Sequence, residues 1–130
     1  MAETRMDAAT VRYQVRDMER SIAFYTGALG FRLDRRSGPF VQVSRGPLVL
    51  ILSGPGTSGA RDMPDGRKQQ PGGWNRIIVW VDDLEADITR LHAGGATFRN
   101  EVEAGPGGSQ ILVEDPDGNP IELHEAPKQA

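Results

Sequence analysis

The chain contains an internal repeat, and this repeat constrains the fold more than any other feature. A shift of 66 residues places the segment that begins at Val11 on the segment that begins at Ile77. In both copies an alternating apolar stretch runs into an aspartate, Asp17 or Asp83, and then into residues with helical spacing. An aspartate side chain at this place can cap a helix by accepting a hydrogen bond from the first turn. Each half of the chain is therefore predicted to open with a strand followed by a helix.

Glycines end both predicted helices, and three short strands follow each helix. Gly30 ends the first helix and Gly94 and Gly95 end the second, because glycine adopts the left-handed conformation beyond a last turn at the least cost. Turn residues separate the strands, which are expected at residues 31–36, 40–45 and 48–53, and again at 97–101, 110–114 and 120–124. The pattern predicts an α+β fold of two tandem βαβββ modules. Each curved sheet is expected to turn one face to its helix and the other toward the second sheet.

The two modules are expected to form a single domain over residues 1–130. Module one covers about residues 9–53 and module two about residues 74–126. Residues 54–73 lie between them and are rich in glycine, proline and polar side chains, with no apolar period. Such a composition predicts a long, mobile connector.

Composition and charge exclude several classes of function. The 130 residues include 15 Lys and Arg against 18 Asp and Glu, a formal net charge of −3, and no basic stripe suited to a nucleic acid. The absence of cysteine excludes disulfides, thiolate metal clusters and a cysteine nucleophile, and we expect a cytoplasmic protein. No window approaches the ~20 apolar residues that a membrane helix needs, and the first residues lack the pattern of a signal peptide. We therefore expect neither nucleic acid nor a membrane as a partner.

Three segments of the sequence carry a resemblance to a known family. They are VRDMERSIAFYTGALGF at residues 15–31, VDDLEADITRLHAGG at 81–95 and GPGGSQILVEDPDGNPIELHE at 105–125. They resemble the vicinal oxygen chelate superfamily, which groups glyoxalase I, bleomycin-resistance proteins and extradiol dioxygenases. The DPDGNPIEL ending is the most specific of the three. The resemblance implies paired βαβββ modules that form a U-shaped cleft, usually within a homodimer.

In metal-dependent members of that family four side chains converge on a divalent ion. When these four metal-binding positions are carried over to this sequence by the resemblance, they fall on Thr10, Ile51, Arg76 and Glu122. Only Glu122 is a competent ligand, because isoleucine has no donor atom and a guanidinium is always positively charged. We expect Arg76 to neutralise Glu122 across the cleft, and we expect no divalent metal and no other cofactor. An atypical metal site of Glu122 and His124 stays an alternative.

Strand alternation from these places predicts which side chains face the cleft. The residues that alternate with them along each strand, and therefore point to the other face, are almost entirely apolar. This is typical of a sheet face that packs on helices. The candidate ligand-binding residues are Arg12, Gln14, Gln42, Arg76, Trp80, Glu122 and His124. Other interpretations stay open: the arginines as solvated charges, Trp80 as a core or dimer anchor, and His124 as a surface residue.

Three functions are compatible with these residues. The first is a non-catalytic module that binds or sequesters a small ambipolar or aromatic molecule in a metal-free cleft, as antibiotic-resistance proteins of the bleomycin type do. The second is a lyase, isomerase or epimerase in which Glu122 is the catalytic base and Arg76 stabilises an enolate. The third is a metal-dependent glyoxalase or dioxygenase. Whether the protein is an enzyme is left open, as is the identity of the ligand.

Overall fold

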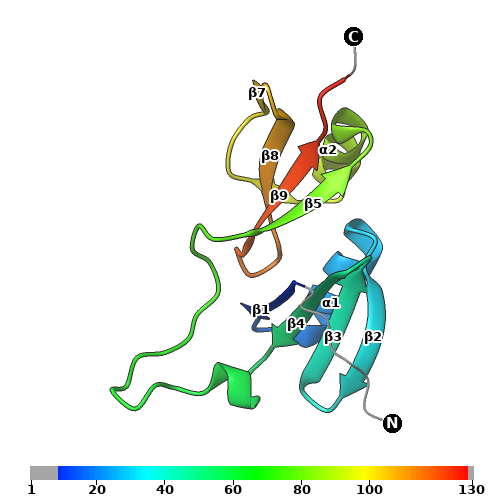
Figure 1. Cartoon of the computed structure of the whole chain (residues 1–130). Coiled ribbons are helices and arrows are strands. Elements are labelled where there is room, and N and C mark those ends of the chain that lie inside the picture. The colour runs from blue at the N-terminus through cyan, green and yellow to red at the C-terminus, as the bar shows by residue number, and fades with distance from the viewer. Residues whose placement is uncertain (1–8, 129–130) are drawn as a thin grey trace. The chain divides into compact units, whose positions relative to one another are not determined.

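The computed structural model of the protein describes residues 9–128. The chain divides into two compact units, residues 1–70 and residues 71–130, here called the N-terminal and C-terminal units. Each unit holds one sheet with a helix on one of its faces, and the predicted α+β fold with two βαβββ-type sheets is confirmed (Figure 1). No helix among the described residues has the length and apolar character to cross a membrane.

The N-terminal unit is built on a four-stranded sheet with the order β1-β4-β3-β2. Strands β1 and β4 are parallel, and the other pairs are antiparallel. Its elements are β1 (Thr10–Gln14), α1 (Met18–Ala23), a π-helical turn η1 (Phe24–Ala28), β2 (Arg32–Ser37), β3 (Phe40–Arg45) and β4 (Leu48–Ser53).

The C-terminal unit repeats this plan, with the order β5-β9-β8-β6 and with β7 also paired to β8. Strands β5 and β9 are parallel, as β1 and β4 are in the first unit. Its elements are β5 (Ile77–Val81), α2 (Leu84–Ala93), β6 (Thr97–Phe98), β7 (Glu103–Gly105), β8 (Gly108–Glu114) and β9 (Pro120–Glu125). The shared order of strands explains why the sequence repeats with a fixed offset.

The predicted helix starts and ends are present in both units. The side chains of Asp17 and Asp83 each accept a hydrogen bond from the backbone N–H three residues further on, at 3.2 and 3.0 Å. Gly30 and Gly95 have φ values of 72° and 87°, in the left-handed region that favours glycine after a helix.

The apolar parity of the strands forms the core of each unit. Six of the eight residues that strand alternation assigns to the helix-facing side are at most 8% exposed. They are Tyr13, Val15, Ile77, Val79, Ile121 and Leu123. Burying one such side chain contributes about 1.5–3 kcal/mol, so this parity is the main local reason for the strand register.

Two elements differ from the prediction. The first helix widens at Phe24, where the N–H of Leu29 bonds to the carbonyl five residues earlier at 3.3 Å, and the following Tyr25 is fully buried. The strand expected at residues 97–101 breaks after Phe98, because the side-chain oxygen of Asn100 accepts the N–H of Leu112 at 2.9 Å in place of a backbone carbonyl. Neither feature follows from apolar periodicity.

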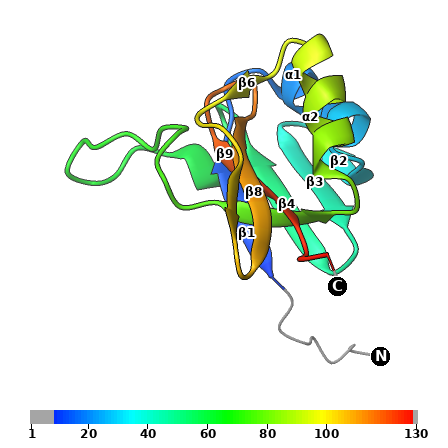
Figure 2. The ribbon, with the colours of Figure 1, turned by 90° about the horizontal axis from the view of Figure 1, so that it is seen from above.

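The connector, residues 54–73, is a long loop with one short 3₁₀ turn, η2 (Ser58–Ala60) (Figure 1; green in Figure 2). Near its start, the side-chain amide of Gln14 donates to the carbonyl of Gly59 at 2.8 Å. Near its end, the N–H of Gly72 donates to the side-chain oxygen of Asn119 at 2.8 Å. The connector is therefore attached at its start to the N-terminal unit and at its end to the C-terminal unit.

Candidate functional site

The seven predicted ligand-binding residues fall into two groups, one on each unit. Three lie on the N-terminal sheet: Arg12, Gln14 and Gln42. Four belong to the C-terminal unit: Arg76, Trp80, Glu122 and His124. Strand pairing places the members of each group on one face of their own sheet, since Arg12 and Gln42 both pair with Ile51, and Trp80 pairs with His124.

Two residues of the N-terminal group bind the unit's own chain. Arg12 Nη1 donates to Ser53 Oγ at 2.7 Å, on the neighbouring strand β4. The Gln14 amide donates to the connector at Gly59, as described above. Both side chains therefore help to fix the chain that leaves β4.

The third residue of the N-terminal group, Gln42, belongs to a network around Asp34. A hydrogen bond from Ser44 lowers the pKa of Asp34, and against the opposing effect of burial the bonds from Arg32 and Gln42 lower it further. Asp34 lies at the irregularity in the pairing of β2 with β3. Gln42 thus stabilises a bulge in the sheet, a role that its place on the strand did not indicate.

The C-terminal group forms one connected ionic cluster around Glu122. Arg76 donates from Nη2 at 2.9 Å and from Nε at 3.1 Å to Oε1 of Glu122, and His124 Nδ1 lies 2.9 Å from Oε2. The Glu122 side chain is only 6% exposed, and a carboxylate so placed is costly unless it is paired. The cluster therefore satisfies both oxygens of a buried carboxylate.

Arg76 pairs with Glu122 as the sequence predicts, and the pair lies within one sheet. Both residues belong to the C-terminal unit. Strands β5 and β9 are parallel neighbours in which Ile78 pairs with Glu122. Arg76 lies two residues before Ile78 and on the same side, so its side chain reaches Glu122 within one sheet.

His124 is held between two acceptors. Its Nδ1 faces Glu122, and its Nε2 lies 2.9 Å from the carbonyl oxygen of Gly107. Neither oxygen can donate, so the ring satisfies both contacts only as an imidazolium. The bond to Gly107 and then the bond to Glu122 raise the pKa of His124. The His124 side chain is 15% exposed and is therefore partly buried at the surface of the sheet.

The same contacts determine the charge state of Glu122. Burial alone would raise the pKa of Glu122, but the hydrogen bonds from His124 and Arg76 outweigh that effect and lower it. A general base that works near neutral pH needs a pKa close to that pH. Glu122 is instead held as a carboxylate with little tendency to take a proton.

Trp80 presents an aromatic surface next to this cluster. Its ring centroid lies 4.5 Å from that of His124, and the two rings are inclined by 51°. Trp80 is 57% exposed and Ile78 is 45% exposed, so the interpretation of Trp80 as a core residue is wrong. The exposed indole therefore lies beside the ionic cluster and in contact with its histidine.

Arg99 is a site residue that the sequence did not indicate. Its Nε lies 2.8 Å from Glu114, and its Nη1 and Nη2 donate to the carbonyls of Gly73 and Gly118 at 2.6 and 2.8 Å. The guanidinium also lies 4.6 Å from the ring centroid of Trp74. Arg99 therefore links the segment that leads through Arg76 into β5 with the turn between β8 and β9. Only the register of β6 with β8 brings these groups together.

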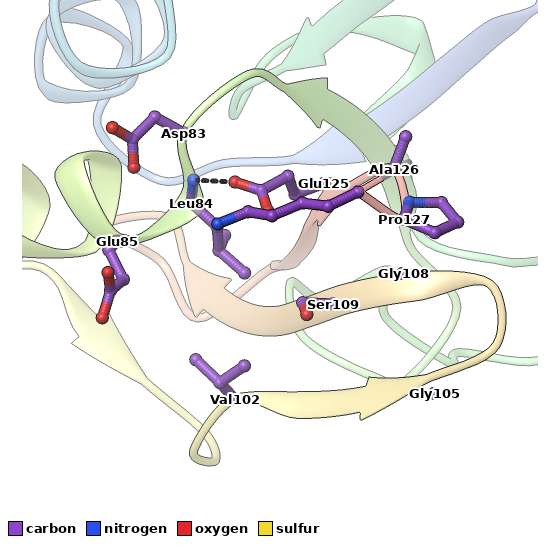
Figure 3. Close-up of a pocket in the computed structure, with 11 residues that line it drawn as sticks. Asp83, Leu84, Glu85, Val102, Gly105, Gly108, Ser109, Glu125, Ala126 and Pro127 are labelled. Carbon is purple, nitrogen blue, oxygen red and sulfur yellow. Dashed lines mark hydrogen bonds between the residues drawn. The ribbon is translucent and has the colours of Figure 1, made fainter. Parts of the chain in front are cut away.

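A pocket of about 540 Å³ lies at the start of α2 and contains none of the predicted ligand-binding residues (Figure 3). Oε1 of Glu125 accepts the N–H of Leu84 at 2.9 Å, and the Asp83 side chain accepts the N–H of Ala86 in the same first turn at 3.0 Å. Glu85 lies on the same helix, and Val102 adds apolar surface opposite (Figure 3). Glu125 and Asp83 already accept two of the N–H groups in the first turn of α2, and the pocket adds no evident chemistry.

The positions that the family uses for a metal do not fit a divalent ion in this chain. A guanidinium, that of Arg76, already neutralises Glu122. Ile51 has no donor atom, and Thr10 has one hydroxyl. Across residues 9–128 no three His, Cys, Asp or Glu side chains gather into a potential metal site. The expectation of a metal-free site stays a prediction.

These features define a class of protein: two βαβββ modules, with polar and aromatic side chains on a sheet face turned away from the helix. A family model described as the Glyoxalase/Bleomycin resistance protein/Dioxygenase superfamily matches residues 7–123, and the chain belongs to this superfamily.

Relatives of this chain include both a catalyst and a binding protein. Lactoylglutathione lyase of Salmonella typhimurium is 35% identical over 121 residues, which cover 87% of each chain. The structure of TnmS3, an antibiotic binding protein from Streptomyces sp. CB03234, is similar with a TM-score of 0.71 and 26% identity over 97% of this chain and 100% of that one. A superfamily member from Sphaerobacter thermophilus has the same TM-score and 29% identity over 93% and 98% of the two chains.

Proposed function

We propose that the protein binds a small ambipolar or aromatic organic molecule and holds it without converting it, in a site that needs no metal. The observation that carries this proposal is the state of Glu122, with Arg76 on one carboxylate oxygen and His124 on the other. The likeness to an antibiotic binding protein supports it. The ligand would lie on the surface formed by Arg76, which directly precedes β5, and by the exposed Ile78 and Trp80 of β5.

The proton-abstraction alternative requires a different environment for Glu122. A base at this place would need a raised pKa, whereas the contacts of Glu122 lower it. The arrangement therefore suits recognition of a ligand better than transfer of a proton.

The test is a titration of the protein with a broad panel of aromatic and antibiotic-like compounds, in which tryptophan fluorescence reports binding. The chain has two tryptophans, Trp74 and Trp80, so the matched variants Trp74→Phe and Trp80→Phe assign the signal. We expect saturable quenching that persists in Trp74→Phe and is lost in Trp80→Phe. A panel in which no compound changes the emission of Trp80 would contradict the proposal.

A lyase activity is the second candidate, because a lactoylglutathione lyase is 35% identical to this chain. Its test is an assay with lactoylglutathione, with and without added zinc or nickel, on the protein and on Glu122→Gln. We expect no turnover in either. Turnover that Glu122→Gln abolishes, while the variant still binds substrate, would replace our proposal. A stoichiometric divalent ion in protein purified without chelator would also replace it.

We further propose that the protein is a homodimer, as its resemblance to this family implies. The check is light scattering on the eluting protein, with an expected mass of twice the 14.2 kDa of one chain. A single-chain mass at micromolar concentration would reject the dimer but leave the ligand proposal intact.

A further inference from the structure

The charge of the Glu122 cluster limits which ligands can bind to the surface formed by Arg76, Ile78 and Trp80. The inference rests on the proposed function, because it concerns the ligand of the same site. Arg76 and His124 flank a single carboxylate, so the cluster contains two cationic groups and one anionic group. A ligand that approaches it meets a local excess of positive charge.

Arg76, directly before β5, and two exposed residues of β5 form a surface that changes from charged to aromatic along the chain. Arg76, Ile78 and Trp80 alternate along the chain and therefore share one side of the sheet. Their Cα atoms span about 13 Å at the rise of an extended strand. The strand lies at the edge of its sheet, and Ile78 and Trp80 are 45% and 57% exposed. The face thus has a charged end, an apolar middle and an aromatic end.

The charged end has hydrogen-bond donors available for a ligand. A guanidinium carries five N–H groups. Within residues 9–128, Arg76 directs Nε and Nη2 to Glu122 and one Nη1 hydrogen to the carbonyl of Trp74 at 3.4 Å, while its side chain remains 29% exposed. The remaining N–H groups can donate to a carboxylate, and such charge-assisted bonds are about twice as strong as neutral ones. An amine at the same place would be repelled.

The aromatic end has one face that a ligand can cover. His124 packs against one side of the Trp80 indole, and the ring is otherwise largely exposed. A flat ring stacked on the outer side would gain aromatic contact and bury the indole. We propose that this face selects planar aromatic carboxylates, with the ring on Trp80 and the carboxylate on Arg76.

The experiment compares three probes of the same shape: 2-naphthoate, 2-naphthamide and 2-naphthylmethylammonium. Binding is followed at neutral pH by the indole N–H signals of ¹⁵N-labelled protein and by calorimetry. A charge-assisted hydrogen bond corresponds to a difference of about tenfold or more in affinity. We expect 2-naphthoate to bind at least that much more tightly than either other probe, with the Trp80 signal moving most.

Variants separate the two ends of the site. Arg76→Gln should reduce 2-naphthoate binding to the level of 2-naphthamide, whereas Trp80→Leu should weaken all three probes. Because Arg76→Gln leaves Glu122 with His124 as its remaining partner in this cluster, the double variant with Glu122→Gln tests the same loss without the buried carboxylate. Arg90→Gln, on the exposed side of α2, is the matched control and should bind 2-naphthoate as the unmodified protein does.

The outcomes distinguish this inference from the proposed function. Equal binding of the three probes that still requires Trp80 would overturn the selection of carboxylates and leave aromatic binding standing. Tighter binding of the ammonium probe would also overturn it. If no probe binds and no compound of the wider panel changes Trp80 emission, both proposals fail. Equal loss of 2-naphthoate binding in Arg90→Gln and in both Arg76 variants would show that Arg76 has no special role.

Discussion

At the scale of single residues, the buried Glu122 cluster makes the stability of the C-terminal unit depend on pH. The pKa of Glu122 is lowered from 4.5, so its contribution is complete above that pH and is lost as the pH falls through the folded-state pKa. The pKa of His124 is raised from 6.5, so its contribution is complete below that pH and is lost as the pH rises through the folded-state pKa. Stability should therefore be greatest between these two limits.

The check is urea denaturation at pH 5.5 and at pH 8.5. We expect a lower free energy of unfolding at the higher pH, and a smaller decrease in His124→Gln, because glutamine can still donate to Glu122 but does not titrate. His92, the second histidine of the chain, provides the control variant His92→Gln, which should keep the full decrease. The same pH dependence in all three proteins would contradict the assignment to His124.

A second residue-scale prediction concerns the close approach of the connector to β1. A Cβ at Gly59 would collide with the guanidinium of Arg12 and lie 2.9 Å from Ser53 Oγ. Gly59→Ala should therefore break the Arg12–Ser53 hydrogen bond and lower the free energy of unfolding by about 0.5–1.5 kcal/mol. Gly27→Ala, where a Cβ meets nothing within 4 Å, is the control.

A double-mutant cycle checks the cause of that loss. In an Arg12→Ala background, Gly59→Ala should cost clearly less, because the closest colliding group has been removed and only the approach to Ser53 Oγ remains. Additive losses in urea denaturation would mean that Gly59 acts through some other contact.

The candidate site could be predicted in part, and the reason lies in the range of the interactions. Strand alternation and the repeat offset placed Arg76, Glu122 and His124 on one face, since both depend only on spacing along the chain. The actual partners of Gln14 and Arg12 could not be predicted in this way. They depend on the path of the connector, whose residues follow no period. Spacing along the chain therefore does not determine where these residues lie.

At the scale of elements, Arg99 joins three segments of the C-terminal unit: the end of the connector, strand β8 and the β8–β9 turn. A lysine keeps the charge but has no planar fork, so it cannot reach the same three acceptors. Arg99→Lys should destabilise the unit by about 1–3 kcal/mol and move the indole N–H signal of Trp74.

The matched control is Arg90→Lys, which alters an exposed ion pair with Asp87 on α2. Surface pairs contribute about 0–1 kcal/mol, so the change in unfolding free energy should be small and the Trp74 signal should not move. Equal losses for the two variants in urea denaturation would rule out a special role for Arg99.

Most elements could be predicted because the signals that define them are local. A capping aspartate, an apolar period and a glycine suffice to place α2, and the offset then places α1. The break between β6 and β7 could not be predicted, because the Asn100 side chain replaces a backbone acceptor for a partner twelve positions away, Leu112. The π-helical turn at Phe24 likewise adds a residue to the helical period without a local sequence signal.

At the scale of the whole molecule, the connector is the segment where a protease should cut first. Residues 61–70 are exposed, and they include the trypsin sites Arg61, Arg67 and Lys68. Proteases cut exposed loops before packed strands. Limited trypsin treatment should therefore cut the chain between the two units before it cuts within either sheet, and mass spectrometry should find fragment ends at these sites. Replacing all three residues with glutamine should delay the first cut markedly.

The charges of the two fragments make this prediction easy to check. Residues 1–70 contain 11 Lys and Arg against 7 Asp and Glu, whereas residues 71–130 contain 4 against 11. An N-terminal fragment should therefore bind a cation exchanger and a C-terminal fragment an anion exchanger once denaturant separates them. If the nicked protein elutes as one species without denaturant, the two units remain associated after the chain between them is cut. A first cut inside a strand, at Arg45 or Arg12 for example, would contradict the division of the chain into two packed units joined by an exposed loop.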